Sequence, residues 1–130
     1  MNQVRIGGGS EYVLFELLSH EVTDGWYEMR ASVAVPGFTS AVNAFLEPTD
    51  FAQFEQQLKV LYDTLQGTAE LHPRESQINV VLTGNGRGGI EVTGDISSIS
   101  WTNKLQYGFT IDQTFLVDTL AQLEQLGSGV

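Results

Sequence analysis

The sequence predicts an α+β fold in two layers, an antiparallel sheet of about six or seven strands with two helices packed on one face. In most segments apolar and polar residues alternate with a period of two, as in strands that have one covered face. Two other segments carry apolar residues three or four positions apart, as in amphipathic helices. Such strands and helices bury each other's apolar sides most simply in two layers.

The first third of the chain has the strand pattern in three runs: "EYVLFELL" (11–18), "WYEMRASVAV" (26–35) and "FTSAVNAFLE" (38–47). In the second run Met29 falls on the covered face, while Trp26 and Glu28 fall on the solvent face. This run therefore predicts a half-buried strand.

The period then changes in "EPTDFAQFEQQLKVLYDTLQGT" (47–68). Its apolar residues form one helical stripe: Phe51, Phe54, Leu58, Leu61, Tyr62 and Leu65. Thr49 or Asp50 is expected to cap the start of this helix, and Gly67 its end.

After this helix come "TAELH" (68–72), "SQINVVLT" (76–83), "GIEVTGDIS" (89–97) and "KLQYGFTI" (104–111), and the alternation in the last three predicts three more half-buried strands. A second helix follows in "DQTFLVDTLAQLEQL" (112–126), capped by Asp112 or Thr114. Its inward residues are expected to be Phe115, Leu116, Leu120 and Leu123. No internal repeat is evident. Residues 1–130 are expected to form a single domain, with 1–10 and 127–130 as loose termini.

The composition excludes several classes of protein. The chain of 130 residues has no cysteine, which excludes disulfides, thiol catalysis and thiolate metal sites. No stretch approaches the roughly 18 apolar residues of a membrane span. The first twenty residues lack the long apolar region of a signal peptide, so a cytoplasmic location is expected.

Acidic residues dominate the charge. Sixteen acids against six basic residues give a formal charge of −10, and the acids are scattered along the chain. A negative surface repels nucleic acid and anionic lipid, and it attracts cationic partners. Acidity also serves solubility alone, so charge by itself names no partner.

The stretch "TGNGRGGIEVTGD" (83–95) contains the spacing G-x-G-x-x-G in Gly84, Gly86 and Gly89. In a dinucleotide site these glycines open a helix. Here a strand pattern follows, so the stretch predicts a hairpin, with Asn85 and Gly86 suited to the turn. Further along, Gly94 is expected at a bulge or a close backbone approach.

The two histidines offer weak candidates for chemistry. In "ELHPRE" a strand would place Glu70 and His72 on one face, with Glu75 beyond the proline, but a third ordered metal ligand is not evident. His20 lies in "SHEVTDG", which is better explained as a hairpin connection. No nucleophile elbow occurs. We therefore expect no catalytic, cofactor-binding or metal-binding residues.

The solvent face of the sheet is the candidate for binding a protein partner. It combines Trp26 and Glu28 with Glu91 and Asp95, and its expected further members are Thr93 and Gln106. An exposed aromatic residue beside an acid is typical of an interface anchor. Alternatively, Trp26 packs on a strand edge or under the segment that contains Trp101.

From Phe45 onward the sequence resembles the WapI family of bacterial contact-toxin immunity proteins. The resemblance rests on "FLEPTDFAQFEQQLKVLYDTLQGTAEL", "GGIEVTGDI" and "LQYGFTIDQTFLVDTLAQL". It covers about two thirds of the chain, and its motifs are structural. The resemblance implies a protein that binds and neutralises a secreted toxin domain, in that family a nuclease acting on transfer RNA. No functional residue can be carried over.

The leading hypothesis is a non-enzymatic, cytoplasmic binding protein of the immunity type that covers a basic toxin. The main alternative is a domain that binds a small ligand or catalyses a reaction in a pocket between helices and sheet, with Glu70 and His72 at its mouth. A third is a scaffold or self-associating subunit. A deep cavity with converging polar groups would favour the second, and a filled core with a flat polar face would favour the first.

Overall fold

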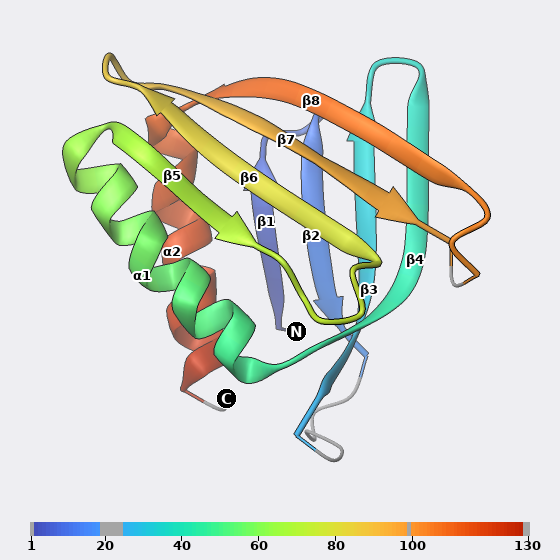
Figure 1. The fold of residues 1–130 in the computed structure, drawn as a ribbon. Helices are drawn as coiled ribbons and strands as arrows, with labels where there is room; N and C mark the ends of the chain where they lie inside the picture. The colour runs from blue at the N-terminus through green and yellow to red at the C-terminus, as the bar shows by residue number, and fades with distance from the viewer. Residues whose placement is uncertain (1, 19–24, 99, 129–130) are drawn as a thin grey trace.

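The computed structural model of the chain describes residues 2–18, 25–98 and 100–128. It contains two four-stranded antiparallel sheets, each followed along the chain by a helix (Figure 1). The first half comprises β1 (Gln3–Gly7), β2 (Tyr12–Leu17), β3 (Tyr27–Val35), β4 (Phe38–Leu46) and α1 (Pro48–Thr64). The second comprises β5 (Gln66–Leu71), β6 (Ile78–Asn85), β7 (Gly89–Ser97), β8 (Lys104–Asp112), the short 3-10 helix η1 (Gln113–Phe115) and α2 (Leu116–Gly127).

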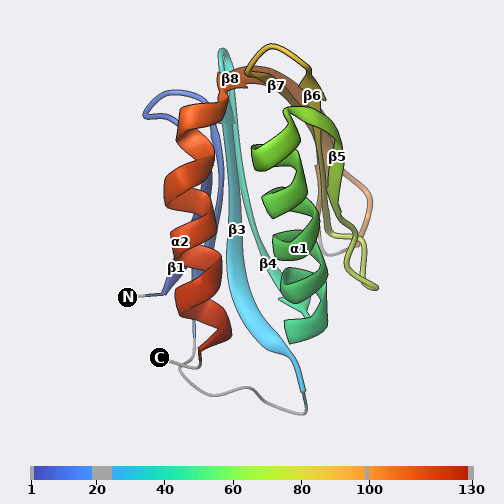
Figure 2. The ribbon, with the colours of Figure 1, turned by 90° about the vertical axis from the view of Figure 1, so that its left-hand side faces the viewer.

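Each sheet is a meander, in which every strand pairs with its neighbour in sequence. Figure 1 shows the strands of the second sheet running across those of the first, and Figure 2 shows the two helices side by side, with α2 beside β1 and α1 beside β5. The order of four strands and a helix therefore occurs twice, although the sequence shows no repeat.

The predicted α+β class is confirmed, but the single sheet of six or seven strands is wrong. The structure has eight strands in two sheets, whose apolar faces share one core with both helices. The period of two marks a strand with one covered face, and it does not say what covers that face. Here much of the cover is the other sheet.

Helix α1 reaches from one sheet to the other. Near its start, the Phe51 ring meets Phe15 of β2 edge-on, with centroids 5.6 Å apart, and lies 6.0 Å from the ring of Tyr27. At its end, a Cβ added to Gly84 of β6 would clash with the carbonyl oxygen of Leu65. The missing side chain at position 84 thus lets the helix end pack against the second sheet.

The helices also cover one edge of each sheet. On β1, the backbone N–H of Arg5 donates to Gln122 Oε1 at 2.7 Å, and Thr119 Oγ1 donates to the Arg5 carbonyl at 2.5 Å. On β5, the N–H of Glu70 donates to Gln57 Oε1 at 2.8 Å. Side chains of α2 and α1 thus satisfy backbone groups that an edge strand would otherwise expose.

The ends of the chain differ from the prediction. Residues 3–7, expected in a loose terminus, form the edge strand β1, which pairs with β2 and packs against α2. At the other end α2 continues to Gly127, and residues 129–130 lie outside the described part of the chain.

The N-cap of the first helix lies two residues before Thr49 and three before Asp50, the predicted caps, and its C-cap lies two residues before the predicted Gly67. Glu47 is the N-cap, and its backbone N–H donates to the Asp50 carboxylate at 2.8 Å. The C-cap is Leu65, which has a φ of 63°, in place of the expected Gly67.

The start of the second helical segment is confirmed at Asp112, whose Oδ1 accepts the backbone N–H of Thr114 at 2.9 Å. Of the residues expected to face inward on this segment, Leu116 and Leu123 are buried, whereas Phe115 is 43% exposed. Phe115 ends the 3-10 turn, so it does not share the stripe of α2.

The glycine-rich stretch is a hairpin between β6 and β7, as predicted. Gly86 and Gly88 have φ values of 81° and 99°. Asn85 contributes through its side chain, because its Oδ1 accepts the N–H groups of Arg87 and Gly89 at 2.7 and 3.1 Å. No helix follows the glycines, so the dinucleotide interpretation is excluded.

Candidate partner-binding surface

The structure divides the predicted surface between the two sheets. In the first sheet, Trp26 directly precedes β3 and Glu28 is the second residue of that strand. Glu91 and Asp95 lie on β7 in the second sheet. Because the sheets turn their buried faces toward a common core, their outer faces point away from each other. The four residues therefore form two candidate surfaces.

The outer face of the second sheet is acidic, and it is hollowed between β6, β7 and β8 around Thr83, Glu91 and Thr110. Its charged residues are four acids and one lysine: Glu70, Glu91, Asp95, Asp112 and Lys104. Between them lie short side chains, in rows that pair Thr68 with Thr83, Glu91 with Thr110, and Thr93 with Gly108. Thr93 and Gln106 are on this face, as predicted.

One hydrogen bond and one ion pair hold the Asp95 side chain on this face. Its Oδ1 accepts the Asn79 side-chain amide at 2.9 Å, and its Oδ2 lies 3.8 Å from the Lys104 ammonium. The same Asn79 contacts His72 Nδ1 through Oδ1 at 3.2 Å. Asp95 is thus oriented and partly neutralised, whereas Glu91 is exposed with no ion pair among the described residues.

The outer face of the first sheet has balanced charge. Its acids Glu16 and Glu28 are matched by Arg5 and Arg30, and Glu16 lies directly opposite Arg30 in the β2–β3 register. The Arg5 guanidinium lies 4.0 Å from the centroid of the Tyr12 ring. The negative charge expected over the whole surface is therefore uneven, and of the two outer faces the second sheet's carries the excess.

Trp26 packs within the chain through a contact that the sequence did not predict. It is half-buried, and the Arg74 guanidinium lies 5.7 Å from the centroid of its ring. Arg74 Nη2 also lies 3.2 Å from Glu47 Oε1. Other aromatic side chains are more exposed than Trp26: Phe38, Phe45 and Trp101 are 61%, 41% and 56% exposed.

The acids around His72 do not form a metal site in the described structure. His72 Nε2 lies 3.8 Å from Glu70 Oε2, and His72 Nδ1 contacts Asn79. Glu75 takes part in neither of these two contacts. Over residues 2–18, 25–98 and 100–128, no three histidine or acidic side chains gather closely enough to hold a metal ion. His20 and the acids beside it lie outside the described residues.

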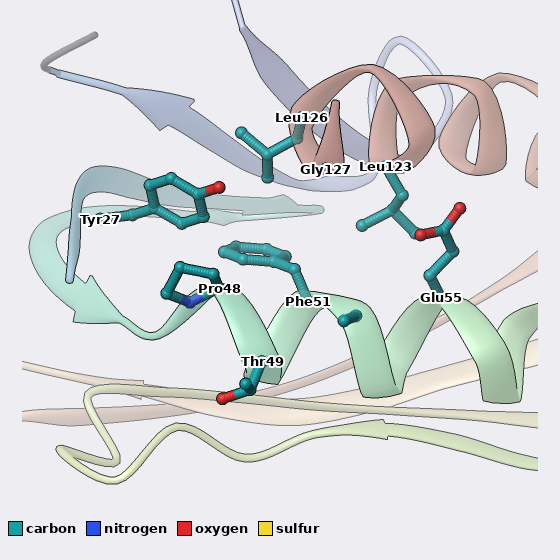
Figure 3. A pocket seen from close by; sticks show the side chains of 9 residues that line it. Tyr27, Pro48, Thr49, Phe51, Glu55, Leu123, Leu126 and Gly127 are labelled. Carbon is teal, nitrogen blue, oxygen red and sulfur yellow. The ribbon is translucent and has the colours of Figure 1, made fainter. Parts of the chain in front are cut away.

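A small apolar pocket lies between the start of α1 and the end of α2 (Figure 3). Its volume is about 220 Å³, and its lining includes Tyr27, Phe51, Leu123 and Leu126. The one charged side chain in the lining is Glu55, which lies 3.5 Å from Lys59 Nζ. Ligand pockets are usually about 300 Å³ or more, with several converging polar groups. The small-ligand alternative had placed Glu70 and His72 at the mouth of such a pocket, but neither residue lines this one.

Together these features define an α+β protein with one shared apolar core, one acidic sheet face and, over the described residues, no cluster of metal-binding side chains. Over the described residues, neither helix is long and apolar enough to cross a membrane. The profile of the Immunity protein WapI-like family matches residues 5–127. The chain therefore belongs to this family, and the resemblance noted in the sequence is confirmed.

Other comparisons bear on the fold. The chain is similar to a solved structure described as "Crystal structures of trypanosoma bruciei MRP1/MRP2", with a TM-score of 0.51 and 12% sequence identity. The similarity covers 98% of this chain and 84% of that one. At this identity it concerns the architecture alone. A search of curated proteins gives no match.

Proposed function

We propose that this chain neutralises a toxin by binding it, through electrostatically steered occlusion of a basic toxin domain. Membership of the immunity family supports a toxin as the partner. We propose further that the toxin is cationic, as many nucleases are. We also propose that this protein acts without catalysis and that the two proteins meet in the cytoplasm.

The outer face of the second sheet carries the proposal. It presents four acids against one lysine on four paired antiparallel strands, so a cationic surface can approach without a change of fold. The formal charge of −10 extends this attraction beyond the contact. Complementary charge raises association rates and discriminates against wrong partners. An acidic cover would also compete with the phosphates of a nucleic-acid substrate.

The test uses the candidate toxin encoded beside the gene and measures association and dissociation rates at about 50 and 500 mM salt. We expect a one-to-one complex whose association rate falls by about tenfold or more at high salt. The chain should also abolish the toxin's activity at equimolar concentration. Absence of a complex would reject the toxin as partner, and a complex indifferent to salt would reject the steering.

A matched pair of variants locates the steering surface. Glu70→Gln with Glu91→Gln removes two charges from the acidic face, and we expect the association rate to fall by about threefold or more at low salt. Asp63→Asn with Glu124→Gln removes two exposed charges from the helices and should change the rate less. Equal effects of the two double variants would show that only the net charge matters.

One feature that supports the small-ligand alternative is the pocket between the helices. Its size and single paired carboxylate favour at most a small apolar molecule. Native mass spectrometry of the purified protein tests this directly. A bound small molecule that Leu123→Trp displaces would favour the alternative.

A further inference from the structure

A hollow of about 270 Å³ lies where the end of β4 meets the segments before β6 and after β7. Its walls are Phe45 of β4, Glu75 and Gln77 before β6, and Trp101 after β7. We call these four residues the corner pocket. The Ser97 N–H donates to the Gln77 carbonyl at 2.8 Å and so ties the two segments together. Figure 1 shows the β7–β8 connection reaching past β4 on this side of the molecule.

The pocket presents aromatic surface to solvent. Phe45 and Trp101 are 41% and 56% exposed, although most large apolar side chains of the chain are buried. Trp101 also has a φ of 56°, a backbone conformation that glycine adopts more easily than tryptophan. Exposed aromatic side chains are typical anchors of protein interfaces.

The charge at the pocket is negative. Glu75 is part of its wall, and Glu28 lies directly opposite Phe45 in the β3–β4 register, with its side chain exposed. No lysine or arginine is among the described residues that line it. An apolar side chain placed here would leave the Glu75 carboxylate without a partner, and a phosphate would be repelled.

The chain itself contains the full combination of groups around Arg74, the residue before Glu75 in the sequence. Arg74 lies over the Trp26 ring, 5.7 Å from its centroid, with Nη2 3.2 Å from Glu47 Oε1. This unit joins a guanidinium, an indole and a carboxylate. The corner pocket offers an indole, that of Trp101, and a carboxylate, that of Glu75, but no guanidinium. Arg74 does not supply one, because it pairs with Glu47.

We propose that the corner pocket receives an arginine side chain of the partner protein. The planar guanidinium stacks on Trp101 and Phe45 while its N–H groups donate to Glu75. A lysine ammonium lacks the flat surface that stacks on two rings. The identity of the partner as a basic toxin rests on the function proposed above, whereas the chemistry of the pocket does not.

The pocket can be tested without the toxin by NMR of the two tryptophan indole N–H signals, assigned with Trp26→Phe. The probe is acetyl-Gly-Arg-Gly-amide, and its control carries citrulline, which is neutral, in place of arginine. We expect the arginine peptide to shift the Trp101 signal and to leave the Trp26 signal in place. Glu75→Gln should raise about fivefold the concentration of arginine peptide that is needed for half of the Trp101 shift. An unmoved Trp101 signal, or an equal response to citrulline, would overturn the proposal.

The second measurement is the affinity for the toxin. Trp101→Ala and Phe45→Ala should each weaken the complex by about tenfold or more, and Glu75→Gln by about fivefold. Phe115→Ala and Glu124→Gln alter an exposed aromatic and an exposed acid elsewhere, and should change affinity less than about twofold. Unchanged affinity in the Trp101 and Glu75 variants would remove the pocket from the interface and overturn the proposal. If the toxin fails to bind while the peptide still shifts Trp101, the proposed function falls and the arginine site stands.

Discussion

The Tyr107 hydroxyl donates a 2.8 Å hydrogen bond to the backbone carbonyl of Asn79, across the intervening strand β7. The bond is possible because Gly94 of β7 has no side chain. A Cβ there would clash with both the Asn79 carbonyl oxygen and the Tyr107 hydroxyl. The register is regular at this point, so Gly94 marks a close approach and no bulge. The bond crosses the strand that carries Glu91 and Asp95.

Gly94→Ala is expected to destabilise the fold. The added methyl group must displace the Tyr107 ring or part the strands, so the free energy of unfolding should fall by about 2 to 3 kcal/mol. Gly9→Ala is the control, because a Cβ there meets nothing within 4 Å. Urea unfolding of the two variants measures the difference. Equal stability would contradict the close packing at Gly94.

Tyr107 should also make stability depend on alkaline pH. Burial, with a smaller contribution from the nearby Asp95 charge, raises the pKa of Tyr107 above its ordinary value of 10.0. Above pH 10 the unfolded chain releases this proton while the folded protein keeps it, so rising pH favours unfolding. Its contribution is complete below pH 10 and falls by about 1.4 kcal/mol per pH unit above it. Tyr107→Phe should remove that part of the slope in unfolding measured between pH 9 and 11, and equal slopes would reject the assignment.

Much of the secondary structure follows from residue periodicity. Met29, Val80 and Phe109 lie on the buried faces of their strands as the alternation predicts, and Phe54 and Leu58 lie on the buried stripe of α1. These patterns are long and uninterrupted, so local sequence suffices to predict them.

Local sequence does not predict which strands and helices pack against each other. Strand β1 was missed because five residues ending in a glycine run give a weak pattern, and what covers its edge lies more than a hundred residues away, at Thr119 and Gln122. Glu28 and Glu91 were expected on one face of a single sheet, but they lie on different sheets. Both lie at exposed positions, but alternation does not assign a strand to one sheet or the other.

The contacts between α2 and β1 provide a prediction about the edge of the first sheet. Thr119 is fully buried and its hydroxyl donates to the Arg5 carbonyl, so Thr119→Val should lower the unfolding free energy by about 1 to 2 kcal/mol. Gln122→Ala should speed hydrogen exchange at the Arg5 amide, which loses its acceptor. Gln125→Ala, at an exposed position of the same helix, should do neither. Unchanged exchange at Arg5 would show that the helix does not protect this edge.

Asp112 ends the acidic face and starts the last helical segment, which suggests a test at low pH. Hydrogen bonds from the backbone and side chain of Thr114 lower the pKa of Asp112 below its ordinary value of 3.8. A lowered pKa means that the folded state favours the charged carboxylate, so its contribution is present above pH 3.8 and is lost as pH falls through the folded value. Asp112→Ala should therefore destabilise the protein at pH 7, and the difference from the unmodified chain should shrink below pH 3.8. Asp63→Ala, at an exposed position near the end of α1, is the control. A stability difference that does not change between pH 7 and pH 2 would mean that Asp112 acts by something other than its charge.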